Sequence, residues 1–500
     1  MSKRITVTDF GNGIADNKYS RTVGQCSFSK NFDLTMMRNV LFPLPGVATD
    51  STGQTNIAII KPGSDNQMWG LGEDGSGNGK MYSKADAASN WASSTAGLTA
   101  PAAASSTFLV EHRSKWYFAR SAAGVIYSVN LDGTGASAAT ARTIASATFL
   151  AAHRHSKNDK IYFAYTTSSG AFIASYDGSS WADTALSSLP TNFTPTALWE
   201  YDTMLAIVGY VANESFLYLW DCDETRVTIT ASEPLGACRA RVMNSIDGYL
   251  IIVSDYPANT SSSEVSKSVI FHAYGGGKPQ IIKQITSYNV ADSSAAVTIN
   301  PKVNFVDAGK FFFSFDLTGN KTIHGLSSLS RNKNNGLWVY TVEQGATNDN
   351  SETSVLAAAR IAGYTYFVHT SVGTITRTIN SSVLDSLFAQ TCIYETLVNP
   401  EMPDGDWMQK KQLLSFEIFT EPLYSAAQVV VKYRVDSTSA FSTTIMTKTA
   451  TSPDTRLTHY KAVTASGDRF VSGTNIEFRI ESTKGARIVG YAYEYDILKI

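Results

Sequence analysis

The sequence predicts an all-β protein built around a β-propeller, with an extended N-terminal arm and a C-terminal β-sandwich. Two patterns predict this architecture. A strand–turn–strand pattern returns about once every 45–50 residues along roughly the first 390 positions. After it, apolar and polar residues alternate with period 2 over about 95 residues, which is typical of half-buried strands. A long amphipathic helix would show a period near 3.6, and the chain has no such stretch.

Residues 1–47 form the predicted arm. Residues 5–10 are one candidate strand, and residues 41–46 read Leu-Phe-Pro-Leu-Pro-Gly, an extended connection. The arm has no sustained period, so it cannot build a core, and exposed apolar side chains would be a liability on a monomer. We therefore expect it to pack on the rest of the chain and to bridge neighbouring subunits in a ring. Seven apolar residues are the candidate assembly interface: Phe10, Ile14, Phe28, Phe32, Leu34, Leu41 and Phe42.

Residues 48–398 carry the repeats of the predicted propeller. Each copy is a short apolar run, a polar or glycine hinge and a second apolar run, followed by another hairpin. Repeats of this length with about four strands each are typical of propeller blades. Seven copies predict seven blades, and six would follow if the first, least regular copy is not a full blade. The hinges between the first two strands are Asn66, Lys115, Lys160, Thr203, Gly248, Lys310 and Gly363.

Residues 404–500 are expected to form a separate β-sandwich. The alternation covers residues 410–420, 428–436, 474–481 and 486–496, with polar turns between these runs. The candidate core residues of this region are Phe416, Ile418, Val430, Phe478 and Ile488.

The composition excludes several classes of function. The 41 Lys and Arg nearly balance the 43 Asp and Glu, so clustered positive charge for a nucleic-acid groove is not expected. No apolar run reaches the length of a membrane span, and the N-terminus lacks the apolar core of a signal peptide. The four cysteines lack metal-binding spacing and are expected to be reduced. We therefore expect no membrane span, no sequence-specific nucleic-acid partner and synthesis in the cytosol.

The candidate catalytic and metal-binding residues do not form a recognisable site. His153 and His155 share one strand face but have no nearby ligand pattern, which favours histidines on the surface or between blades. Residues 74–79 open like a calcium loop, but Ala85 stands where a bidentate Glu is needed. Asp221, Asp223 and Glu224 could support glycoside hydrolysis, but sialidase-type Asp boxes are absent. The sequence predicts no enzyme, no metal and no cofactor.

Several segments resemble bacteriophage tail proteins that carry propellers. Residues 10–17, Phe-Gly-Asn-Gly-Ile-Ala-Asp-Asn, are similar to the opening of those proteins, residues 24–34 to the next part, and residues 43–46 to the Pro-Gly that precedes the first blade. The Lys-Lys-x-Leu entry at Lys410 and the strand at residues 431–436 are also similar. The resemblance implies a structural virion protein of the nozzle or distal part of a short tail, assembled with copies of itself and other tail proteins.

Two other functions stay open at this point. A receptor-binding virion protein would add a host-surface glycan as partner and would need an exposed aromatic groove. A propeller glycoside hydrolase would need two carboxylates roughly 5–10 Å apart in a central pocket.

Overall fold

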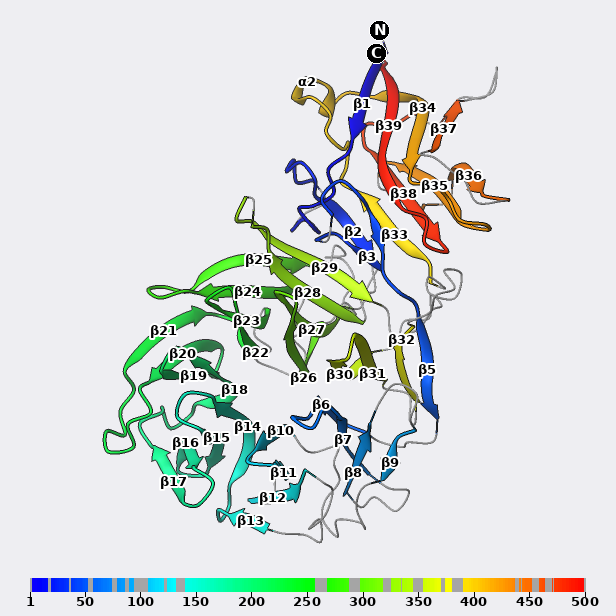
Figure 1. The fold of residues 1–500 in the computed structure, drawn as a ribbon. Helices are drawn as coiled ribbons and strands as arrows, with labels where there is room; N and C mark the ends of the chain where they lie inside the picture. Colours follow the sequence, from blue (N-terminus) through cyan, green and yellow to red (C-terminus); the bar gives the residue numbers. More distant parts are fainter. Residues whose placement is uncertain are drawn as a thin grey trace. The chain divides into compact units, whose positions relative to one another are not determined.

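The computed structural model contains two compact units (Figure 1). The propeller unit comprises Thr49–Leu326 and Glu352–Arg377, and the composite unit comprises Met1–Ala48, Ser327–Ser351 and Thr378–Ile500. The only helix among the described residues is α2 (Asp404–Trp407). The structure describes residues 2–16, 19–35, 37–52, 57–73, 79–85, 90–93, 107–120, 124–131, 140–256, 268–286, 297–317, 325–333, 335–344, 354–369, 374–379, 390–436, 440–441, 443–451, 458–463, 470 and 472–498.

The propeller unit is organised around the first strand of each of the seven repeats. Each first strand contacts the first strand of the next repeat, and the seventh contacts the first, so the seven strands form a closed ring (Figure 1). This ring confirms the predicted β-propeller with seven blades. The first strands are β6 (Ile59–Pro62), β10 (Leu109–His112), β14 (Thr148–His155), β18 (Thr194–Tyr201), β22 (Arg239–Ile246), β26 (Val297–Asp307) and β30 (Val355–Ile361).

The second strand of each repeat pairs antiparallel with the first. The second strands are β7 (Met68–Glu73), β11 (Lys115–Arg120), β15 (Lys160–Thr167), β19 (Met204–Val211), β23 (Tyr249–Tyr256), β27 (Lys310–Leu317) and β31 (Tyr364–His369). All seven predicted hinges lie in, or directly after, the turn between these strands. Asp247 and Gly248 have φ of 50° and 79°, and Ala362 and Gly363 have 49° and 81°. Two consecutive positive φ values are typical of type I′ turns, whose twist matches that of the paired strands.

Two further strands complete a four-stranded sheet in most repeats. In the first five repeats these are β8 (Gly79–Lys84) and β9 (Ala92–Ser93), β12 (Val125–Asn130) and β13 (Thr140–Thr143), β16 (Gly170–Tyr176) and β17 (Trp181–Leu186), β20 (Glu214–Trp220) and β21 (Ala231–Gly236), and β24 (Ser268–Tyr274) and β25 (Gln280–Thr286). Large apolar side chains fill the space between neighbouring blades. Trp69 packs near Trp116, and Tyr162 meets Trp220 edge-on with ring centroids 5.6 Å apart.

The last blade takes its outer strand from the other end of the repeat region. Its sheet has the order β30-β31-β32-β5, with β32 (Thr374–Thr378) followed by β5 (Val47–Thr52). The segment before the first repeat therefore completes the seventh sheet. This pairing closes the propeller between sequence positions more than 300 residues apart.

The composite unit combines strands from the arm with strands from the C-terminal region. One sheet has the order β1 (Lys3–Val7), β39 (Ile488–Ile497), β34 (Lys411–Thr420) and β37 (Thr458–Val463). The facing sheet contains, in order, β28 (Leu326–Arg331), β29 (Trp338–Gln344), β2 (Cys26–Lys30), β33 (Cys392–Thr396), β38 (Ile476–Thr483), β35 (Gln428–Val435) and β36 (Thr443–Thr449). A short hairpin of β3 (Phe32–Asp33) and β4 (Phe42–Pro43) adds to the arm.

The predicted sandwich is present, and its core is aromatic. Phe416 is fully buried and lies 4.8 Å from the ring of Phe478 and 5.6 Å from that of Tyr491. Ile418 and Ile488 are also fully buried. The expectation for Val430 was wrong by one residue, because its neighbours Val429 and Val431 face the core and Val430 faces outward on the same strand.

Candidate functional site

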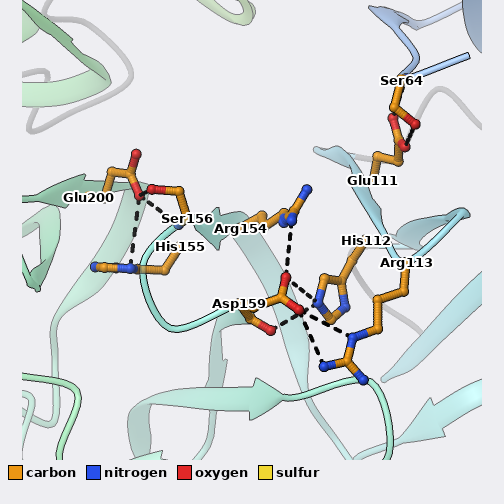
Figure 2. Close-up of polar contacts among 9 residues, drawn as sticks. All are labelled: Ser64, Glu111, His112, Arg113, Arg154, His155, Ser156, Asp159 and Glu200. Carbon is orange, nitrogen blue, oxygen red and sulfur yellow. Dashed lines mark hydrogen bonds and ion pairs between the residues drawn. The ribbon is translucent and has the colours of Figure 1, made fainter.

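The turns after the first strands carry a repeated polar network (Figure 2). Glu111, the second-last residue of β10, accepts hydrogen bonds from the backbone N–H and the hydroxyl of Ser64 in the preceding blade. Glu200 holds the same position in β18, and Ser156 of the preceding blade donates to it from its N–H and its hydroxyl, both at 2.7 Å. Each carboxylate therefore fixes the turn of the blade before it.

Two buried histidines link the same turns in the opposite direction. His112 ends β10, and its Nε2 donates to the carbonyl oxygen of Asp159 at 2.9 Å (Figure 2). His155 ends β14, and its Nε2 donates to the carbonyl oxygen of Met204 at 3.2 Å. Both histidines are fully buried, and a carbonyl oxygen can only accept, so each Nε2 carries its proton. His155 is therefore a blade-packing residue, as the sequence predicts, and the network is a structural one.

A second polar cluster lies on the first strands near the propeller axis. Lys61 Nζ donates to the carbonyl oxygen of Asn304 at 3.2 Å, and Asn244 Nδ2 donates to Asn304 Oδ1 at 2.7 Å. Lys61 and Asn304 belong to the first and sixth blades, which are not neighbours, so their bond crosses the ring. His153 stacks on Trp199 with ring centroids 4.4 Å apart.

Burial tunes the charges of this axial cluster. It lowers the pKa of Lys61 to about 8 and that of His153 to about 4. At neutral pH Lys61 therefore keeps most of its charge and His153 is neutral. One cation, held by a backbone carbonyl, occupies the axis.

The three carboxylates at residues 221–224 serve to order a turn. Asp223 Oδ1 accepts hydrogen bonds from the N–H and hydroxyl of Thr225. Glu224 Oε1 accepts from Lys160 Nζ at 2.7 Å and from the Ser175 hydroxyl at 2.6 Å. Among the described residues no three His, Cys, Asp or Glu side chains come together as a metal site. The glycine-rich loop at residues 74–78 lies outside the described residues.

The seven arm residues expected at a subunit interface lie inside the composite unit. Six of them are buried within the single chain, and Phe42 is half-buried beneath the guanidinium of Arg487, 4.3 Å from its ring centroid. Phe10 meets Tyr394 edge-on at 5.4 Å. Because these side chains already pack against their own chain, they leave no surface for a neighbouring subunit. The expectation that the arm packs on the rest of the chain holds, and the interface assignment of these residues is corrected.

A cavity of about 320 Å³ lies in the composite unit, beneath the arm loop at residues 20–25. Tyr394 of β33, Tyr491 of β39 and residues 397–402 form its walls. Gly24 has φ of 75°, and a Cβ there would meet the Asp9 carboxylate at 2.8 Å, so only glycine lets the loop pass. The sequence analysis missed this cavity. The available signal was Glu401 in the run Pro-Glu-Met-Pro, a lone carboxylate in a rigid turn.

The described strands define a β-propeller protein whose two chain ends build a second, sandwich-like unit. No described helix has both the length and the apolar character that a membrane crossing requires. A scan against protein-family models found no match, and a search of curated proteins found none either.

Several solved structures are similar to this chain at low identity. The N-terminal domain of Nup159 has a TM-score of 0.41 and 8% identity, covering 68% of this chain and 98% of that one. A chain of the mitotic checkpoint complex has a TM-score of 0.40 and 12% identity, covering 67% and 95%. A glycoside hydrolase has a TM-score of 0.31 and 11% identity, covering 89% and 99%. Likenesses this low carry no functional information.

Proposed function

We propose that this protein is a structural subunit of a bacteriophage virion, a ring component of the nozzle or distal part of a short tail. The observation that carries the proposal is where the phage-like segments lie. Residues 10–17, 24–34 and 43–46 from one end, and residues 410–413 and 431–436 from the other, all belong to the composite unit. Strand β1 pairs with β39, and β2 pairs with β33, so the segments that carry the resemblance build one object together.

The assembly contact in this proposal uses the exposed apolar residues of the composite unit. Tyr19, Val23 and Met408 are 44%, 54% and 79% exposed. Tyr19 packs edge-on against Trp407, with ring centroids 6.2 Å apart, and Met408 directly follows Trp407. Large apolar side chains gathered on a surface are typical of protein–protein contacts. In a ring, this patch meets a different patch on the next copy or on another tail protein.

The proposal assigns no catalytic role to the chain and places it in the virion after synthesis in the host cytoplasm. Its partners are copies of itself and other tail proteins. The described carboxylates at residues 221–224 are engaged in local bonds, which favours a structural role over hydrolysis.

The test is a charge placed on the proposed patch. The double variant Val23→Asp and Met408→Asp should keep its fold, because both side chains are exposed, and should fail to enter virions when it replaces the natural protein. Ile281→Asp is the control, since Ile281 is 61% exposed in the propeller unit. Particle composition and mass in solution are the measurements. Normal incorporation of the double variant would refute the assembly patch, and absence of the protein from every particle would refute the virion role.

A further inference from the structure

The cavity of the composite unit contains two buried tyrosine hydroxyls that lack partners among the described residues. Tyr394 and Tyr491 are each 1% exposed, and both line the cavity. Their neighbours on β39 behave differently: Tyr493 donates to the Pro400 carbonyl and Tyr495 to the Asp406 carboxylate. Buried tyrosine hydroxyls normally find a hydrogen-bond partner. The two hydroxyls in the cavity are therefore available to a bound molecule.

The charges around the cavity leave one carboxylate without a counter-ion. Asp9 is paired with Arg38, with 2.5 Å between its Oδ2 and Nη2. Arg21, the cation of the lining, donates to the Met402 carbonyl at 3.0 Å and lies over the Trp407 ring at 5.3 Å. Glu401 forms no ion pair with any described residue. Partial burial and then the neighbouring charge of Asp9 raise the pKa of Glu401.

The wall that carries Glu401 is rigid. Asn399 Nδ2 donates to the carbonyls of Trp407 and Thr474, while Asn399 Oδ1 accepts from the N–H of Ile476. Glu401 itself has φ of 58°, a conformation that costs energy for a residue with a Cβ. The loop therefore holds the carboxylate in place beside the two tyrosines. Glu401 is also exposed on one side, so a ligand can reach it.

We infer that this cavity binds one organic cation with N–H donors, a primary ammonium or guanidinium group, with Glu401 as its counter-ion. The oxygens of Tyr394 and Tyr491 accept further N–H bonds, and the aromatic rings of the lining attract the positive charge. A neutral sugar could satisfy the hydroxyls, but it would leave Glu401 unbalanced. This inference stands independently of the virion proposal, because it concerns only the chemistry of the cavity.

The experiment measures binding to the full chain by calorimetry with three probes. These are arginine blocked at both ends, the citrulline derivative with the same blocking groups, and methylguanidinium. Citrulline keeps the shape of arginine and removes its charge. We expect the blocked arginine to bind at least about tenfold more tightly than the citrulline derivative. Methylguanidinium binding as tightly as the blocked arginine indicates a free cation as occupant, and weaker binding indicates a side chain of another protein.

Variants test which residues are responsible. Glu401→Gln should weaken arginine binding at least about tenfold while leaving the melting temperature unchanged, because the side chain is exposed. The paired change of Tyr394 and Tyr491 to Phe should weaken binding without removing the charge preference. Glu214→Gln removes an exposed carboxylate of the propeller unit and should have no effect. Equal affinity for arginine and citrulline, unchanged binding in Glu401→Gln, or no binding of any probe at millimolar concentration would overturn the inference.

Discussion

Lys84 and Asp50 form an ion pair in which each side chain is only 2% exposed, with 3.1 Å between Nζ and Oδ1. Asp50 lies in β5, the outer strand of the seventh blade, and Lys84 ends β8 of the first. The same carboxylate accepts from Arg377 Nε in β32 and from Trp91 Nε1 in the first blade, both at 2.8 Å. One buried carboxylate thus joins the first and last blades of the propeller.

Removing this carboxylate should destabilise the propeller unit strongly. Asp50→Ala leaves Lys84 buried without its partner, and breaking a buried pair in this way costs about 3–5 kcal/mol. Denaturant unfolding of the full chain measures the change. Asp202→Ala is the control, because Asp202 pairs with Lys157 at the surface, 72% and 53% exposed, and such pairs contribute at most about 1 kcal/mol. Equal losses from both variants would show that the closing pair has no special weight.

Acid should destabilise the propeller unit partly through His272. Burial lowers the pKa of His272 to about 4, whereas an unfolded histidine titrates near its model value of 6.5. Below pH 6.5 the unfolded chain gains a proton that the folded chain refuses, so stability falls until the pH reaches the folded pKa near 4. One such group accounts for a loss of about 3 kcal/mol across this window.

His272→Gln tests this loss, because glutamine stays polar and does not titrate. The free energy of unfolding of the variant should fall less between pH 6.5 and 4 than that of the natural chain, by up to about 3 kcal/mol. His153, with its pKa also lowered to about 4, remains and accounts for part of the residual slope. Identical slopes in the two proteins would contradict a neutral His272 in the folded state.

Truncating the centre of the sandwich should destabilise the composite unit. Phe416 is fully buried between Phe478 and Tyr491, and Phe→Ala at such a site costs about 3–5 kcal/mol. Met408→Ala in the same unit is the control, since Met408 is 79% exposed and such changes stay within about 0.5 kcal/mol. Denaturant unfolding followed by the aromatic signal of the sandwich reports both. A loss below about 1 kcal/mol for Phe416→Ala would argue against this core.

Deleting residues 2–40 should unfold the composite unit and spare the propeller unit. The deletion removes β1 and β2, which pair with β39 and β33, and uncovers Tyr394 and Tyr491. Limited proteolysis with mass spectrometry should show cleavage after residue 390 and protection of residues 57–317. If the C-terminal region of the truncated chain resists protease as the full chain does, the arm is not part of its core. The deletion is therefore a poor assay of assembly, and the surface variants above are the better one.

The features predicted from the sequence are those with local signals. Each hinge, such as Gly248 or Gly363, sits beside the two strands it joins, so the repeat itself marks the turn. Strand β5 reads Val-Ala-Thr-Asp-Ser-Thr and has no apolar alternation, because its partner is a distant edge strand. The burial of Phe10 was hidden for the same reason, since Tyr394 lies almost 400 residues away. The cavity depends on three such distant segments, and only Glu401 between two prolines could have drawn attention to it.

The pairing of Lys3 with Tyr495 sets an order for the synthesis of this chain. Translation at about 5–20 residues per second separates the two residues by roughly half a minute to a minute and a half. The propeller can close once Arg377 has emerged, because Asp50 is already present. During the remaining time β1 and β2 wait with Phe10 and Phe28 uncovered. The arm therefore passes through its most aggregation-prone state on every ribosome, and a chaperone that shields the first 48 residues would act in that interval.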